Sequence, residues 1–108
     1  MDNRARFAAL AENFAGEPGV DVGQGTRKAF GSSALKVNGK IFAMVTSADE
    51  FVVKLPRPRV EELEASGIGQ KFDPGHGRLM KEWLAVPANA ENRWPELARE
   101  ALLLVQSK

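Results

Sequence analysis

The hydrophobic pattern is clearest in residues 34–45, where two apolar, strand-like runs meet at Asn38-Gly39. An Asn-Gly pair in that position predicts a type I′ β-hairpin, because both central residues of the turn need a positive φ, which Asn and Gly tolerate best. The second run, 41–45, is apolar on both faces of the expected sheet, which is typical of a central strand covered on two sides. The turn also predicts three cross-strand pairs: Val37 with Lys40, Leu35 with Phe42, and Ser33 with Met44.

Helical periodicity lies in three stretches: residues 2–15, residues 58–66, and a last stretch that begins between 89 and 95 and continues to about 106. An Asp or Asn at positions 2 and 3 can cap the first helix, and Gly67 fits the left-handed position just past the second. The side chains expected to be buried are Phe7, Leu10, Ala11 and Phe14 on the first helix, Val60 and Leu63 on the second, and Leu97, Ala101 and Leu104, widened by Ala98, Leu102 and Val105, on the last.

Two further runs, 51–55 and 79–86, alternate as strands do, and the stretch 69–77 between them is rich in turn residues. A short first strand is expected either at 20–22 or at 26–30. Helices at the N-terminus, in the middle and at the C-terminus, packed on an antiparallel meander around the Asn-Gly hairpin, describe an α+β fold. The more buried set of the last strand is expected to be Met80, Glu82, Leu84 and Val86.

Composition narrows the class of protein. The 108 residues are enough for one domain, 1–108, with a buried core. The chain has no cysteine, which excludes disulfides, thiolate metal sites and a cysteine nucleophile. No apolar run approaches the roughly 18 residues of a membrane-spanning helix, and the first residues are mixed in charge. We therefore expect a cytoplasmic protein with no membrane partner.

The residues that could carry catalysis lack partners in the sequence. His76 is the single histidine and lies between two glycines, with no His or Cys companion and no recognisable acid motif around it. Ser32-Ser33 lacks the Gly-x-Ser-x-Gly context of an exposed nucleophile. Residues 23–28 match neither the Gly-x-Gly-x-x-Gly nor the P-loop pattern. We therefore expect no enzymatic activity, no cofactor and no bound metal.

The formal net charge of +1 does not by itself indicate nucleic-acid binding. The charge is uneven, however, because residues 27–81 carry ten Lys and Arg against six Asp and Glu. Basic residues after the 51–55 strand could contact phosphates or could keep a sheet edge soluble. Trp83 and Trp94 leave a similar choice between a stacking platform and a core position. The candidate nucleic-acid contacts are Lys54, Arg57, Arg59, Arg78 and Lys81.

Four segments carry a family resemblance: Leu-Lys-Val-Asn-Gly-Lys-Ile-Phe-Ala at 35–43, Val-Val-Lys-Leu at 52–55, Trp-Leu-Ala-Val-Pro at 83–87 and Trp-Pro-Glu-Leu at 94–97. In this order they resemble the MmcQ/YjbR-like proteins and the related N-terminal domain of the TfoX/Sxy competence regulators. The likeness covers nearly the whole chain. It implies a compact α+β domain of the double-wing kind that binds DNA or regulates transcription, and it brings no catalytic residues.

Two functions follow as expectations. The first is a small stand-alone, non-enzymatic domain that binds DNA through the basic cluster, as the resemblance implies. The alternative is a protein-interaction module or homodimer that uses a sheet edge or an exposed Trp83 and binds no nucleic acid.

Overall fold

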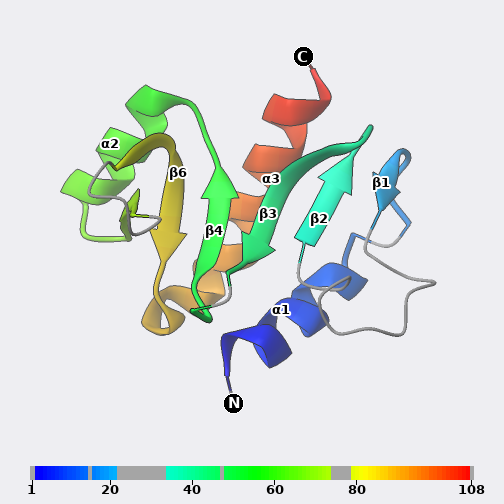
Figure 1. Ribbon diagram of the computed structural model, residues 1–108, viewed down its shortest axis with the longest axis horizontal. Coiled ribbons are helices and arrows are strands. Elements are labelled where there is room, and N and C mark those ends of the chain that lie inside the picture. Colours follow the sequence, from blue (N-terminus) through cyan, green and yellow to red (C-terminus); the bar gives the residue numbers. More distant parts are fainter. Residues whose placement is uncertain (1, 15, 22–33, 47, 74–78, 108) are drawn as a thin grey trace.

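Helices pack against one face of an antiparallel sheet in the computed structural model, which describes residues 2–14, 16–21, 34–46, 48–73 and 79–107 (Figure 1). The strands are β1 (Val20–Asp21), β2 (Ala34–Val37), β3 (Lys40–Val45), β4 (Phe51–Lys54), β5 (Gln70–Phe72) and β6 (Met80–Val86). Within the described ranges they form one sheet in the order β1-β2-β3-β4-β6-β5, and all neighbours are antiparallel. The helices are α1 (Asn3–Glu12), α2 (Arg57–Ala65) and α3 (Trp94–Gln106), with a 3₁₀ helix, η2 (Ala88–Arg93), before the last.

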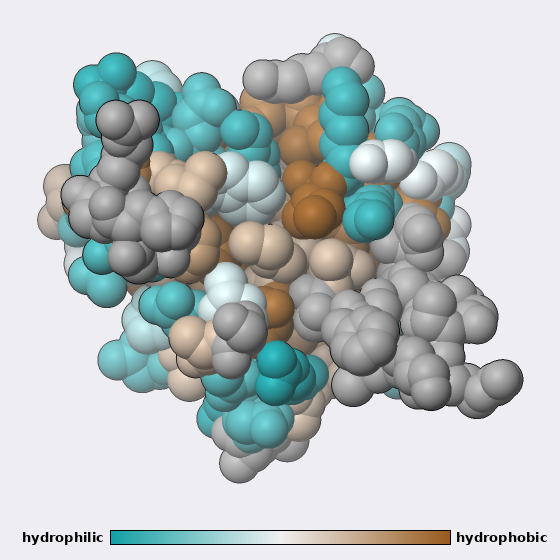
Figure 2. Space-filling view, in the orientation of Figure 1, coloured by the Kyte–Doolittle hydropathy of each residue, from teal (hydrophilic) through white to brown (hydrophobic). Residues whose placement is uncertain are grey.

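The helices share one side of the sheet. In Figure 1, α3 passes behind β3 and β4, and α1 runs along the lower end of the sheet, while α2 packs against β5 and β6. Apolar residues from all three helices join those of the strands in a single buried cluster. The prediction of an α+β fold with helices at both ends and in the middle is therefore confirmed. The opposite face of the sheet, turned to the viewer in Figures 1 and 2, carries no described helix.

The β2–β3 hairpin turns as the Asn-Gly pair predicts. Asn38 has a φ of 53° and Gly39 a φ of 83°, both in the left-handed region that a type I′ turn requires. Val37 pairs with Lys40, as expected. β3 is also a central strand, because it lies between β2 and β4. The described helices cover only one face of it, however, and Ile41 and Met44 stay partly exposed.

The other two predicted pairs of the hairpin are wrong, because β3 contains a bulge. The register shifts between Lys36, which pairs with Ile41, and Leu35, which pairs with Ala43. Phe42 is therefore an extra residue in β3, and bulges of this kind let a strand turn successive side chains towards one region. Phe42 and Ala43 are consecutive and both fully buried. Beyond the bulge Met44 pairs with Ala34, and Ser33 lies outside the described residues.

Aromatic rings fill the middle of the core. Trp94, at the start of α3, stacks on Phe51 of β4 with ring centroids 4.1 Å apart and planes 18° apart. Phe7 of α1 contacts the same Phe51 ring with a centroid distance of 5.9 Å. The Trp94 indole N–H donates to the Pro87 carbonyl at 3.3 Å, so its one polar atom is satisfied although the side chain is buried. Trp94 is thus a core residue.

The ends of α1 and α2 can both be compared with the prediction, and α1 ends earlier than predicted. At the end of α2, Gly67 has a φ of 81°, and the Ile68 N–H donates to the Leu63 carbonyl at 3.0 Å, which are features of a Schellman motif. α1 ends at Glu12 and not near residue 15. The N–H of Phe14 donates to the carbonyl of Ala11, and this tighter turn brings the Phe14 ring to 5.9 Å from Phe42.

The structure also differs from the prediction in the buried stripe of α3 and in strand β5, and it places the first strand at one of the two predicted sites. Leu104 is only partly buried, because the buried stripe of α3 runs through Leu102 and Val105. The turn-rich stretch contains the short strand β5, which escapes a pattern search because three residues are too few to alternate. The first strand is β1 at the Val20 site, and the alternative at 26–30 lies outside the described residues.

Candidate functional site

A hollow of about 560 Å³ lies where β4 ends, α2 begins and β6 starts, at the upper ends of β4 and β6 in Figure 1. Figure 2 shows hydrophilic side chains over this end of the sheet, next to more apolar surface over its middle. We call this region the β4–β6 hollow. The described residues that line it are Lys54, Arg57, Leu79, Met80, Lys81, Glu82 and Trp83.

Local structure explains why these residues meet. Lys54 and Trp83 are paired residues of β4 and β6, and both are only partly buried, whereas the neighbouring pair Val53 and Leu84 is fully buried. Pro56 follows β4 almost at once and serves as the N-cap residue of α2. The helix therefore begins close to the end of the strand, and its first residue, Arg57, lines the hollow. Residues 80–82 of β6 extend past the last β4–β6 pair, so the hollow has a rim on that side.

The Lys54 ammonium is the central charge of the hollow. Its Nζ lies 2.8 Å from Glu82 Oε1 and 5.5 Å from the centroid of the Trp83 ring. A cation in that position over an indole is attracted by the negative face of the ring. Lys54 therefore holds both the carboxylate and the partly exposed indole of the hollow in place.

The two other cations of the hollow are more accessible. Arg57 Nε lies 3.2 Å from Glu61 Oε2, one helical turn further along α2, but its side chain is 58% exposed. An exposed pair of this kind contributes little and is readily exchanged for another anion. Lys81 is exposed and forms no ion pair with a described residue. Both cations can therefore reach a bound anion at small cost.

Arg59 lies outside the β4–β6 hollow. Its guanidinium binds both oxygens of Glu100 on α3, at 2.9 and 2.8 Å, and also Glu62 at 2.8 Å. Hydrogen bonds to Glu100 and then to Glu62 raise the pKa of Arg59 even further above neutrality. Two carboxylates thus surround this cation, which joins α2 to α3. Arg78 and His76 lie outside the described residues.

Three members of the predicted basic cluster therefore come together, and the structure adds apolar residues that the sequence pattern missed. Leu79 and Met80 are 49% and 40% exposed. The expectation that Met80 and Glu82 are buried is wrong, whereas Leu84 and Val86 are buried as predicted. β6 spans seven residues and β4 only four, so Met80 lies beyond the last β4–β6 pair. The Glu82 carbonyl still accepts from the Leu55 N–H at 3.0 Å, and its side chain pairs with Lys54.

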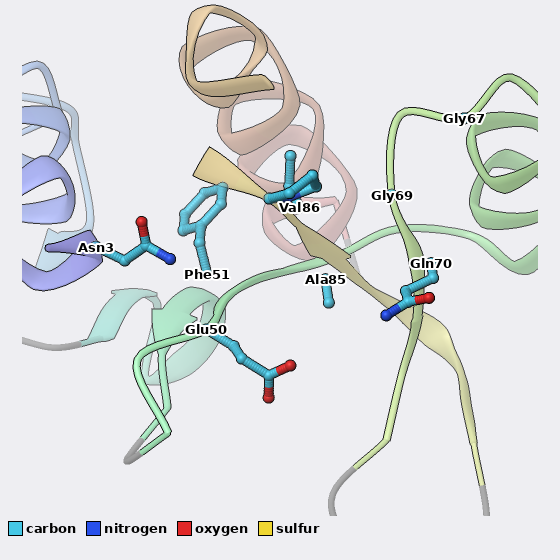
Figure 3. Close-up of a pocket in the computed structure, with 9 residues that line it drawn as sticks. Asn3, Glu50, Phe51, Gly67, Gly69, Gln70, Ala85 and Val86 are labelled. Atoms are coloured by element: carbon cyan, nitrogen blue, oxygen red, sulfur yellow. The ribbon is translucent and has the colours of Figure 1, made fainter. Parts of the chain in front are cut away.

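A second hollow, of about 370 Å³, lies at the opposite end of β4 and β6 (Figure 3). Phe51 and Val86 stand side by side in it, and the Glu50 side chain points away from them. Asn3, at its margin, is engaged by the loop before β4, because its Nδ2 donates to the Asp49 carbonyl at 2.8 Å. Glu50 is the sole ionisable group among the described lining residues, so this hollow lacks the convergent charges of the β4–β6 hollow.

Clusters of metal-ligating side chains and membrane-spanning helices are both absent from the described residues. No three His, Cys, Asp or Glu side chains within those ranges gather as a metal site requires. None of the helices there has the length and apolarity needed to cross a bilayer. In comparisons with protein families, curated proteins and solved structures, nothing matches the chain.

Proposed function

We propose that this domain is a non-enzymatic DNA-binding module and that the β4–β6 hollow is its binding surface. The observation that carries the proposal is the convergence of Lys54, Arg57 and Lys81 on one hollow, from three different elements. Arg78, the remaining candidate of that region, precedes Leu79 of the rim in the chain. The family resemblance of the sequence agrees with the proposal.

Phosphate recognition fits the charges of the hollow. Lys and Arg side chains that neutralise phosphates release bound counterions from DNA, and this release drives sequence-independent affinity. The exposed Arg57 and Lys81 supply such cations directly. Glu82 reduces the local positive charge, because it stands beside Lys54. We therefore expect moderate and strongly salt-dependent binding.

The test is fluorescence anisotropy of a labelled DNA duplex over a series of salt concentrations. With about three phosphates neutralised, the logarithm of the binding constant should fall against the logarithm of salt concentration with a slope of about −2.7. Lys81→Ala should weaken binding and reduce that slope by about 0.9. Lys40→Ala is the matched control, because Lys40 is an exposed lysine at the β2–β3 turn and should leave both quantities unchanged. Absence of binding at low salt, or a slope near zero, contradicts the proposal.

A second candidate function is protein interaction, and it rests on the exposed Leu79 and Met80 at the rim of the hollow. A contiguous apolar patch is typical of surfaces that bind a partner or a second copy, and Leu79 and Met80 with the partly exposed Trp83 would form its centre. Light scattering coupled to gel filtration tests self-association. A dimer mass that returns to the monomer value in Met80→Glu favours this candidate, and a monomer at all concentrations speaks against the homodimer.

A further inference from the structure

We infer that the β4–β6 hollow prefers single-stranded nucleic acid and that an unpaired base stacks on Trp83. This inference rests on the proposed function, because it specifies which form of nucleic acid the same surface takes.

The shape of the surface favours a single strand. The β4–β6 hollow is concave, with a volume of about 560 Å³. A duplex keeps its bases stacked inside, so it can contact this hollow through the phosphates at the rim but cannot place a base in it. A single strand can turn one base out of its path into such a hollow while its phosphates stay at the rim.

The apolar side chains of the hollow need a partner that phosphate does not offer. Trp83 is partly exposed on the sheet face that carries no described helix, whereas Trp94 is only 1% exposed. Leu79 and Met80 add apolar surface at the same rim. Every base has a flat π face that stacks on an aromatic ring, so Trp83 with its apolar neighbours matches a base without regard to sequence.

Lys54 links the stacking position to the phosphate contacts. Its Nζ lies 5.5 Å from the centroid of the partly exposed Trp83 ring, so a flexible lysine side chain covers this face of the ring. A base that stacks there replaces the ammonium on the ring, and the flexible lysine chain keeps that charge close to the phosphate of the same nucleotide.

The experiment compares a labelled oligothymidine of about ten nucleotides, a length within the site sizes of known single-strand binders, with a duplex of equal length. We expect tighter binding of the single strand, and quenching of the tryptophan fluorescence as it binds. Because Trp94 is buried against Phe51, this quenching reports on Trp83.

Trp83→Ala should weaken single-strand binding by about 5- to 150-fold, the range that stacking energies give, and Trp83→Phe should retain part of the affinity. Leu103→Ala, which alters an exposed apolar residue of α3, is the matched control and should change nothing.

The outcomes separate this inference from the proposed function. If the duplex binds as tightly as the single strand and Trp83→Ala has no effect, the inference is wrong while DNA binding stands. If neither nucleic acid binds at low salt, both are wrong. If Trp83→Ala does not fold, the fluorescence of the unaltered protein decides: quenching by the bound oligothymidine supports the inference, and binding without quenching overturns it.

Discussion

At the scale of single residues, Gly39 shows how one backbone angle controls the hairpin. Its φ of 83° lies where an L side chain costs about 1–2 kcal/mol. No atom lies within 4 Å of the position that its β-carbon would occupy, so steric contact adds nothing to that cost. We expect Gly39→Ala to lower the free energy of unfolding by about 1–2 kcal/mol in chemical denaturation.

Gly16 provides the control for this substitution. A β-carbon at Gly16 would also have no atom within 4 Å, but the φ of this residue is outside the left-handed region. Gly16→Ala should therefore leave stability unchanged or raise it by roughly a few tenths of a kcal/mol, since alanine restricts the unfolded chain. Equal losses in the two variants would show that the backbone angle of Gly39 is not the cause.

Single residues of the hairpin show which features of the fold could be predicted from the sequence and which could not. The turn at Asn38-Gly39 was predictable, because the preference for positive φ belongs to those two residues themselves. The bulge at Phe42 was not, because it depends on where Phe14 and the rest of the core need that ring. Trp83 and Trp94 each follow a charged residue, Glu82 and Arg93, and only the folded structure shows that Trp94 is the buried one.

At the scale of elements, a carboxylate on α2 holds the edge strand β5. Glu64 Oε1 accepts from Lys71 Nζ at 2.6 Å, and Glu64 Oε2 accepts from the Lys71 backbone N–H at 3.4 Å. The side-chain hydrogen bond and then the backbone one lower the pKa of Glu64 below its ordinary value of 4.5. Because the carboxylate is bound in the folded protein, it stabilises the fold only while it is ionised.

This contact predicts a pH dependence. A lowered pKa in the folded state means that the stabilisation is complete above about pH 4.5 and is lost as the pH falls through the folded pKa. Glu64→Gln should therefore be less stable than the unaltered protein at neutral pH, and the difference should shrink in acid. Chemical denaturation over a pH series measures both curves.

Glu12 supplies the control for this series. It is an exposed glutamate at the end of α1, and it makes no hydrogen bond or ion pair with a described residue. Glu12→Gln should follow the unaltered protein at every pH. If Glu64→Gln also follows it, the contact with Lys71 does not contribute to stability.

Elements that carry their own end signals were predictable from sequence, and those that depend on a neighbour were not. The end of α2 is encoded by Gly67, which alone sets the left-handed turn. β5 has three residues, and it is held in the sheet by its pairing with β6 and by the hydrogen bond from the Lys71 backbone N–H to Glu64. Gly69 allows the close approach of this segment, since a β-carbon there would collide with the Ala85 carbonyl.

At the scale of the whole molecule, Arg59 connects α2 to α3 through Glu100, 41 residues further along the chain. No local pattern could predict such a partner, which explains why the sequence placed Arg59 among the phosphate contacts. The convergence of Lys54 and Lys81 was predictable only on the assumption that β4 and β6 are neighbours, and the sheet order shows that they are.

Because Arg59 joins α2 to α3, we expect it to matter for stability, whereas Lys81 should matter for DNA binding. Arg59→Gln should lower the free energy of unfolding by about 1 kcal/mol, the upper end for a partly exposed ion pair with two-oxygen geometry. It should weaken DNA binding less than Lys81→Ala does, because its charge is already shared by Glu100 and Glu62. A larger loss of DNA affinity in Arg59→Gln than in Lys81→Ala would contradict this division.

The sheet order also bears on how the molecule folds. β4 and β6 are hydrogen-bonded neighbours, yet α2 and β5 lie between them in the chain, with Lys54 paired to Trp83. Closing that loop costs chain entropy, so this pairing should form after the local β2–β3 hairpin. The β4–β6 hollow takes its residues from both ends of the loop, and it therefore exists only once the loop has closed. A ligand bound there would hold β4 and β6 together, and it should therefore slow the unfolding of the chain.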